Sequence, residues 1–487
     1  MKLLKEIIYG IGIQEVKGLT NIAVEHITFD SRKVNRLTAF IATKGTQSDG
    51  HDFIAQAINN GACCVVCETF PKEFNANVTY IKVNDSSKAL GLIASNFYDN
   101  PSDKLSLIGI TGTNGKTTSA TLLYDLYRLL GYKTGLISTV SIRILHHTIQ
   151  ATHTTPDAIA INRTLNDMVE KGCSHVFMEV SSHAVHQQRI SGLNFKVGVF
   201  TNISRDHLDY HSTFDNYIQA KKMFFDGLSE EAFAILNYDD KHGETMGLHS
   251  SAKVKSYGLN GALDFKGKVL ENHFSGLSLE IDGKEMVSRL IGDFNAYNLL
   301  AAYGVASCLG EDQLTVLTTL SSLKAPEGRF EYFTSESKVI VVVDYAHTPD
   351  ALENVLKTLH TIKKGGESII SVFGCGGDRD KGKRPLMGKI ASDYSNRVIV
   401  TSDNPRSENP EKILEDISKG IVEEKKANSL SISNRREAIK TACSMARSGD
   451  IVLIAGKGHE KYQIIGDQTS HFDDMETTIE ILNQMKK

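Results

Sequence analysis

A glycine-rich stretch with a lysine and threonines, TGTNGKTT at residues 111–118, could hold a chain of phosphates. Backbone N–H groups of such a loop bind phosphate oxygens, the lysine reaches the β and γ phosphates, and a threonine hydroxyl binds magnesium. These roles fall to Gly112, Thr113, Asn114, Gly115, Lys116, Thr117 and Thr118. Ile110 stands where the strict GxxxxGK[ST] pattern has its first glycine. A tight turn would explain the glycines but not the lysine and threonine, so we predict nucleotide binding.

Acidic and histidine side chains follow neighbouring apolar runs of the same region. Glu179 comes after the run at residues 176–178, so its carboxylate should reach the same sheet edge as the loop and could bind magnesium. The stretch TNISRDHLDYH, residues 201–211, concentrates polar groups: Asn202, Asp206, His207, Asp209 and His211. Each alone could be a helix cap, but their density favours a functional loop. NYDD at residues 237–240 is not an NKxD guanine reader, so ATP is favoured over GTP.

A rigid charged corner, TSDNPRSENP at residues 401–410, leaves another apolar run. Similar segments follow three more runs: DYAHTPD, GCGGDRDKGKRP and GKGHEKYQ. Ligands of open parallel sheets lie beyond the carboxyl ends of the strands. We therefore expect the four segments to share a cleft, although a surface turn with an exposed arginine would also explain DNPR.

The elements that position these groups read as an α/β protein with parallel sheets flanked by helices. With 487 residues, about three domains are expected. We place them at residues 1–101, 102–328 and 329–487. In the last domain we predict strands at residues 339–343, 368–373, 397–400 and 451–455, and helices that begin at Pro349 and Pro410.

The composition excludes several classes of protein. Lys plus Arg (54) nearly balances Asp plus Glu (58), so no overall field attracts nucleic acid or anionic membrane. MKLLKEIIYG lacks the features of a signal peptide, and no apolar run of membrane-spanning length occurs, so a cytoplasmic protein is expected. Cys63, Cys64 and Cys67 alternate with valines, which predicts a buried strand instead of a metal site.

Ten ordered segments carry a family resemblance: TGTNGKTT, HTTPDA, MEVSSHAVHQQRI, TNISRDHLDYHSTFDNY, GDFNAYN, PEGRFE, VDYAHTPDA, GCGGDRDKGKRPLMG, DNPR and AGKGHE. Together they resemble the Mur ligases, and within them the members that add meso-diaminopimelate to UDP-N-acetylmuramoyl-L-alanyl-D-glutamate. The resemblance implies a smaller N-terminal α/β domain for the UDP end, a central P-loop ATPase with a parallel sheet and a C-terminal Rossmann-like domain for the amino acid. It also implies a monomer.

The resemblance further implies the residues for the nucleotide-linked substrate. The uridine end would contact Phe29, Ser31, Thr46, Gln47 and Ser48, and the muramoyl dipeptide would contact His153, Thr154, Thr155, Ser181, Gln187 and Arg189. His153 stands where the family has asparagine. Without the resemblance, an ordinary turn or cap would explain each serine or threonine equally well.

For catalysis, the resemblance implies Lys116, Glu179, His207 and Lys221, with Lys221 carbamylated. Two magnesium ions would be held by Thr117, Glu179, His207 and the carbamate of Lys221. Lys222 is adjacent, and a solvated lysine pair is the alternative. Asn298, Arg329 and Asp344 would contact the base, phosphate and ribose of ATP, with the individual roles left open.

For the acceptor, the resemblance implies Arg379, Asp403, Asn404, Pro405, Arg406, Gly456 and Glu460. Diaminopimelate differs from lysine by a distal carboxylate, which a guanidinium can bind through two parallel hydrogen bonds.

The resemblance also implies a mechanism in which an acyl phosphate forms and is attacked by the amine. Closure of the C-terminal domain would use a hinge near residues 325–331. The rival hypotheses are a folylpolyglutamate synthetase and a nucleotide-dependent binding switch.

Overall fold

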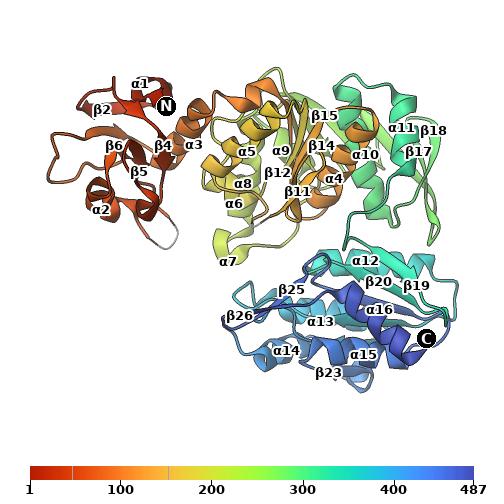
Figure 1. The fold of residues 1–487 in the computed structure, drawn as a ribbon. Coiled ribbons are helices and arrows are strands. Elements are labelled where there is room, and N and C mark those ends of the chain that lie inside the picture. The colour runs from red at the N-terminus through yellow and green to blue at the C-terminus, as the bar shows by residue number, and fades with distance from the viewer. Residues whose placement is uncertain (46–47, 152) are drawn as a thin grey trace.

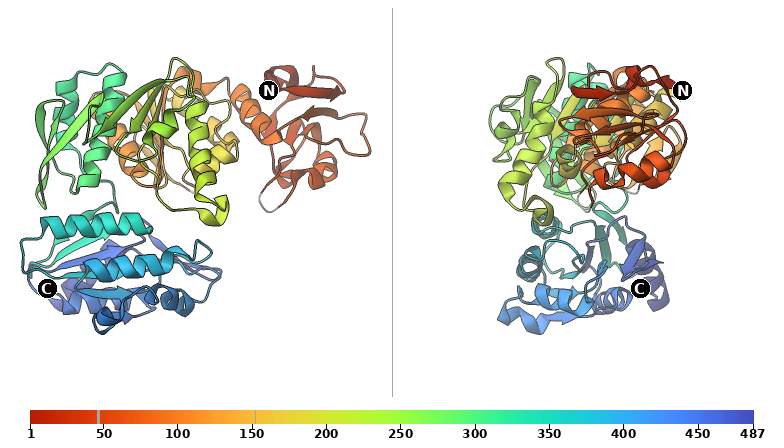
Figure 2. Two further views of the ribbon diagram at one scale, coloured as in Figure 1. Left: turned by 180° about the vertical axis from the view of Figure 1, so that it is seen from behind. Right: turned by 90° about the vertical axis from the view of Figure 1, so that its left-hand side faces the viewer.

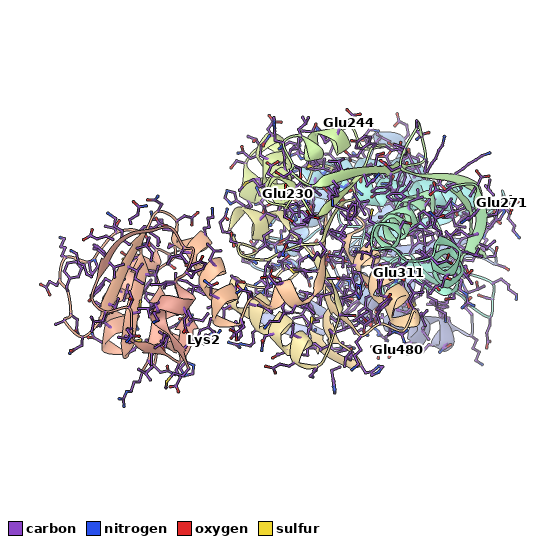
Figure 3. All side chains as sticks on the ribbon, turned by 90° about the horizontal axis from the view of Figure 1, so that it is seen from above. Lys2, Glu230, Glu244, Glu271, Glu311 and Glu480 are labelled. Carbon is purple, nitrogen blue, oxygen red and sulfur yellow. The ribbon has the colours of Figure 1, made fainter. Side chains whose placement is uncertain are left out.

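The computed structural model describes residues 1–45, 48–151 and 153–487 and contains three main sheets (Figure 1). The N-terminal unit lies at one end of the central unit, and the C-terminal unit packs below the central one (Figures 1 and 2). Figure 3 shows Glu271 at the end of the central unit far from the N-terminal unit. The boundaries near residues 101 and 328 remain predictions. Among the described residues, no helix has the length and apolar character that a membrane span requires.

The N-terminal unit is a five-stranded sheet in the order β2-β7-β6-β5-β4. Its elements are β1 (Lys2–Leu3), α1 (Leu4–Ile7), β2 (Ile13–Lys17), β3 (Ala23–Val24), β4 (His26–Thr28), β5 (Thr38–Ile41), α2 (Ile54–Asn59), β6 (Ala62–Cys67), β7 (Thr79–Val83) and α3 (Ser86–Phe97). The three cysteines near residue 65 lie on β6, which confirms the predicted strand.

The central unit contains an eleven-stranded sheet in the order β11-β10-β9-β12-β8-β13-β14-β15-β16-β17-β18. Its strands are β8 (Ser106–Thr111), β9 (Thr134–Ile137), β10 (Ser141–Ile144), β11 (His147–Gln150), β12 (His175–Glu179), β13 (Val197–Phe200), β14 (Phe233–Asn237), β15 (Lys253–Gly258), β16 (Phe265–His273), β17 (Gly276–Ile281) and β18 (Lys284–Ser288). The middle strands are parallel, and antiparallel hairpins extend both edges. The sequence did not predict these hairpins.

Helices cover both faces of this sheet. They are α4 (Lys116–Leu129), α5 (Ala158–Glu170), α6 (Ser182–His186), α7 (Leu208–His211), α8 (Phe214–Asp226), α9 (Gly243–Gly247), α10 (Asp293–Cys308) and α11 (Gln313–Ser322). One apolar core joins the sheet to α4, α10 and α11, and a second joins it to α5 and α8. The parallel strands thus end at one edge, where α4 begins.

The C-terminal unit is a six-stranded sheet in the order β19-β20-β24-β21-β22-β23. Its elements are β19 (Glu331–Thr334), β20 (Ile340–Asp344), α12 (Pro349–Ile362), β21 (Ile369–Phe373), α13 (Lys383–Tyr394), β22 (Arg397–Val400), α14 (Pro410–Ser418), β23 (Ser429–Ser431), α15 (Arg435–Met445), β24 (Ile451–Ala455), β25 (Tyr462–Ile465), β26 (Gln468–His471) and α16 (Asp474–Met485). The four predicted strands and the two helices at Pro349 and Pro410 are confirmed. Thr348 and Asn409 cap those helices, and each proline fills the first turn, where it loses no hydrogen bond.

Candidate active site

The phosphate-type loop lies between β8 and α4, as the sequence predicts. Gly112 and Gly115 have φ of 150° and 86°, and a Cβ on Gly112 would overlap the Thr201 hydroxyl. Lys116 Nζ donates to the carbonyl oxygens of Gly112 at 2.9 Å and Thr113 at 2.8 Å. Burial lowers the pKa of Lys116, which Glu179 and Asp206 oppose. The loop and its lysine therefore form a compact cradle.

A cavity of about 450 Å³ opens over this cradle. It brings together Thr113, Asn114, Gly115, Lys116, Thr117, Thr118, Glu179, His207, Lys221, Asn298, Arg329 and Asp344, whereas Gly112 does not line it. Arg329 Nη2 donates to Thr117 Oγ1 at 3.0 Å, a contact between the C-terminal unit and the loop. Asp344 accepts backbone N–H groups from residues 330 and 346, and burial raises its pKa while Arg329 opposes the shift.

Glu179, at the end of β12, and His207, directly before α7, face the cradle. Both carboxylate oxygens of Glu179, which is fully buried, accept hydrogen bonds from Thr139, at 2.8 Å from N–H and 3.0 Å from the hydroxyl. His207 Nε2 lies 3.4 Å from Asp206 Oδ2, and burial lowers the pKa of His207 to about 3. Its ring is therefore neutral near pH 7 and can offer a lone pair.

The fit to magnesium follows from the donor set. Among the residues that the structure describes, no three His, Cys, Asp or Glu side chains form a ready metal cage. Magnesium normally uses one or two carboxylates together with waters and phosphate oxygens, so it needs no such cage. Glu179, Thr117 and His207 line one cavity beside the lysine cradle, and they fit ions whose coordination ATP completes.

Two consecutive buried lysines on α8 have different partners. Lys221 is 1% exposed, lines the cavity and donates from Nζ to the Gly112 carbonyl oxygen at 2.7 Å. Burial and Lys116 lower the pKa of Lys221 well below its ordinary value. Lys222 instead pairs with Asp226 at 2.5 Å and does not line the cavity. Of the two lysines, only Lys221 lines the cavity beside the cradle.

A second cavity, of about 1040 Å³, shares walls with the first. The loops after β20, β21, β22 and β24 meet here, as predicted from their charge. Arg379, Asp403, Asn404, Arg406, Gly456 and Glu460 line it, together with Thr154, Thr155 and Ser181 from the central unit. Pro405 does not line it, because its carbonyl packs against Gly377, where a Cβ would overlap it.

The acceptor-side groups form a buried network. Asn404 Nδ2 donates to Glu460 Oε2 at 2.8 Å, and Arg406 Nη1 donates to the Gly377 carbonyl oxygen at 2.7 Å. Asp403 Oδ1 is buried without a hydrogen-bond partner. Burial raises the pKa of Glu460, and Asp403 adds to the shift. An unsatisfied buried carboxylate oxygen is the group that an ammonium ligand would satisfy.

Sequence reasoning missed Lys457, which is fully buried beside this network. Its Nζ lies 3.2 Å from Asn404 Oδ1, 3.5 Å from Glu460 Oε2 and 3.8 Å from Asp403 Oδ1. A signal was present, since a lysine between two glycines in AGKGHE could approach a site closely. Sequence reasoning also missed Thr139, the hydrogen-bond partner of Glu179. It missed Asp350 as well, which accepts a hydrogen bond from Asn114 Nδ2 at 2.8 Å between the central and C-terminal units.

A third cavity, of about 1020 Å³, lies between the N-terminal and central units. Phe29, Ser31 and Ser48 line it from one side, and His153, Gln187 and Arg189 line it from the other. His153 and Arg189 also line the second cavity, so the three cavities adjoin one another in a row. Thr46 and Gln47 were predicted for this site and lie outside the described residues.

The residues predicted to bind the dipeptide make hydrogen bonds within the wall between the cavities. Thr155 Oγ1 donates to the Glu179 carbonyl oxygen at 2.8 Å and accepts from Ser181 N–H at 3.1 Å. Arg189 Nη1 donates to the Thr155 carbonyl oxygen at 2.8 Å. Thr154 accepts from Thr139 Oγ1 at 3.1 Å. These bonds fix the wall between the nucleotide cavity and the second cavity.

The three-unit fold and its phosphate cradle define the chain as an ATP-dependent ligase. Family models match the Mur ligase family catalytic domain at residues 23–98, the Mur ligase middle domain at 110–306 and the Mur ligase glutamate ligase domain at 328–458. A relative from Cytophaga hutchinsonii, named UDP-N-acetylmuramoyl-L-alanyl-D-glutamate--2,6-diaminopimelate ligase, is 54% identical over 99% of this chain and 100% of its own. The chain therefore belongs to the Mur ligase family.

Solved structures agree with this assignment. One titled as UDP-N-acetylmuramoyl-L-alanyl-D-glutamate--2,6-diaminopimelate ligase has a TM-score of 0.71 and 33% identity, covering 100% of this chain and 99% of the other. A Mycobacterium tuberculosis folylpolyglutamate synthase, complexed with ADP and AMPPCP, has a TM-score of 0.62 and 18% identity over 76% of this chain and 93% of its own. The second likeness concerns the fold alone.

Proposed function

We propose that this chain joins meso-diaminopimelate to the D-glutamate γ-carboxylate of UDP-N-acetylmuramoyl-L-alanyl-D-glutamate, and that ATP becomes ADP and phosphate. The row of three adjoining cavities, which share lining residues, carries this proposal. It can accommodate a long substrate from Phe29 to Glu179, with ATP on one side of its reacting end and an amino acid on the other. The name of the Cytophaga relative supports the same substrates.

In the first step, the γ-carboxylate attacks the γ phosphorus of ATP and ADP leaves, which yields an acyl phosphate. The loop N–H groups and Lys116 bind and neutralise the phosphates, and positioning of this kind supplies most of the acceleration in phosphoryl transfer. Two magnesium ions, when bound, would neutralise charge on the transferring group; Thr117, Glu179, His207 and Lys221 would hold them. We propose that Lys221 does so as a carbamate, because burial lowers the pKa of its amine and thereby favours the neutral form that adds carbon dioxide.

In the second step, an amine of diaminopimelate attacks the acyl carbon and phosphate leaves with the bonding pair. The amide nitrogen releases its proton. Water would hydrolyse the intermediate, so the C-terminal unit must close over the central one. Contacts of Thr117 with Arg329 and of Asn114 with Asp350 support such closure, and we propose that the hinge lies near residues 325–331.

The acceptor is held at the carboxyl ends of the C-terminal strands. Arg406 and Arg379 would bind its distal carboxylate and other charged end, and Asp403 and Glu460 would accept from its distal ammonium. Asn404, Gly456 and the corner containing Pro405 shape the pocket. We further propose domain boundaries near residues 101 and 328, a monomer and a cytoplasmic location.

Purified protein with ATP, the UDP-muramoyl dipeptide and diaminopimelate tests this proposal. We expect sustained ADP release only with all three substrates, and a product whose mass corresponds to an amide of the two acceptor components. ADP release without an amide would instead support a binding switch. Use of a pterin polyglutamate substrate in place of the UDP-muramoyl dipeptide would support the folylpolyglutamate rival.

A further inference from the structure

The corner TSDNPRSENP contains Ser407 and Glu408, to which the proposed function gives no role. Both contact the loop after β21, which carries Arg379. Glu408 Oε1 accepts the backbone N–H of Asp378 at 2.6 Å. The Asp378 carboxylate accepts from Ser407, at 3.2 Å from N–H and 2.7 Å from the hydroxyl. Reciprocal bonds therefore fasten the two loops together.

Glu408 is itself held in place by a buried arginine. Arg384, in the first turn of α13, is 1% exposed and donates to both Glu408 oxygens, from Nη2 at 2.9 Å and from Nη1 at 3.1 Å. Lys381 Nζ adds an ion pair at 3.2 Å. The hydrogen bonds from Arg384 lower the pKa of Glu408 to about 2. A bidentate pair of this kind fixes direction as well as distance.

The fastened loops carry the two arginines that line the acceptor cavity. Arg406 has φ of 52°, a left-handed conformation that is uncommon for a residue with a side chain. Its backbone N–H donates to Ile464, its carbonyl oxygen accepts from Gly466, and its Nη1 donates to Gly377. Gly377 N–H in turn donates to the Asn404 carbonyl oxygen at 2.9 Å. The contact between the loops thus sets the distance between Arg406 and Arg379.

We propose that Glu408, held by Arg384, is a positioning residue that sets the spacing of Arg406 and Arg379 and thereby the preference for an acceptor with a second carboxylate. The inference rests on the proposed function of this cavity. A guanidinium that binds a carboxylate through two parallel bonds tolerates little displacement. The nucleotide cradle lies on other loops, so a loosened contact should affect the acceptor and leave ATP unaffected.

Two matched variants test this role. Glu408→Gln keeps the side-chain shape but leaves one acceptor oxygen for the donors on Arg384 and Asp378. Asp416→Asn removes the other carboxylate that binds Arg384, at 3.1 Å, and Asp416 has no bond to Asp378. The KM values for diaminopimelate and ATP, kcat and the thermal midpoint are measured for both.

We expect Glu408→Gln to raise the KM for diaminopimelate about tenfold or more, with kcat and the KM for ATP changed less than about threefold. Asp416→Asn should change the KM for diaminopimelate less than about twofold, because the loop contact remains. An equal change in both variants, or an equal rise in both KM values for Glu408→Gln, overturns the inference.

If Glu408→Gln does not fold, Ser407→Ala keeps the buried pair and removes one exposed bond to Asp378. It should raise the KM for diaminopimelate about threefold, and an unchanged KM overturns the inference. A parent enzyme that adds no diaminopimelate overturns the proposed function instead. A parent that prefers diaminopimelate to lysine, together with an unchanged KM in Glu408→Gln, overturns the inference alone.

Discussion

The nucleotide cavity and the acceptor cavity meet at Tyr345 and His347, yet they present charge in different ways. In the nucleotide cavity, Lys116 and Lys221 rest on backbone carbonyls of one loop. In the acceptor cavity, Arg379 and Arg406 also donate to backbone carbonyl oxygens, but they lie on two separate loops that Ser407 and Glu408 fasten together. The carbonyl groups of one loop therefore support the phosphate chemistry, whereas the acceptor side depends on a contact between two loops that can change without disturbing that chemistry.

We expect the largest effect from a substitution in the nucleotide cavity. Lys221→Met should lower kcat about a thousandfold, because it removes the side chain that is proposed to carry the carbamate beside the transferring phosphate. Lys222→Met is the matched control, since this lysine pairs with Asp226 outside the cavity and should change kcat less than about twofold. Steady-state ADP release measures both. Equal losses in the two variants would contradict the assignment of Lys221.

A smaller effect is expected on the acceptor side. Arg406→Ala should raise the KM for diaminopimelate about a hundredfold and leave the KM for ATP unchanged, because only the acceptor carboxylate loses its partner. Arg436, an exposed arginine of the same unit that pairs with Glu480, provides the control. A rise in the KM for ATP as large as that for diaminopimelate would show that the two cavities are not separable.

The third cavity offers a still smaller effect. Phe29 presents a partly exposed ring to the space between the N-terminal and central units. Phe29→Ala should raise the KM for the UDP-muramoyl dipeptide about tenfold, because an aromatic contact surface is lost. Phe74 is similarly exposed but packs on Phe70 and Tyr80 away from the cavity, so Phe74→Ala is the control. Matching KM changes would remove Phe29 from the site.

We expect the smallest effect on the free energy of unfolding, through His459, which lines the second cavity. Burial lowers the pKa of His459 to about 3 from its ordinary 6.5. Below pH 6.5 the imidazole of His459 becomes protonated in the unfolded chain but stays neutral in the folded chain. The free energy of unfolding therefore falls as the pH drops toward 3. Across this window, the free energy of unfolding of His459→Gln should fall by about 1 kcal/mol less per pH unit than that of the parent. Urea unfolding followed by circular dichroism at several pH values measures this, and identical slopes would argue against a neutral buried ring.

The sequence predicted the C-terminal strands closely, because buried parallel strands are continuous apolar runs. The expected strand at residues 339–343 is Ile340–Asp344. It did not predict β11, whose four residues are all exposed, since no apolar run marks such a hairpin. Edge strands of this kind are defined by their pairing and not by burial.

The site shows the same division. The phosphate loop is contiguous and could be predicted from spacing alone. Lys457 and Thr139 could not be assigned as partners of Asn404 and Glu179, because those contacts join segments far apart in the chain. Pro405 belongs to the DNPR motif, but its carbonyl group packs against Gly377 and it does not line the cavity.

The proposed recognition of the acceptor is tested most directly by the ratio of kcat/KM for meso-diaminopimelate to kcat/KM for L-lysine in the unaltered enzyme. These acceptors differ by the distal carboxylate that Arg406 is proposed to bind. We expect a preference for diaminopimelate of about a hundredfold or more. Equal use of lysine would rule out the proposed acceptor.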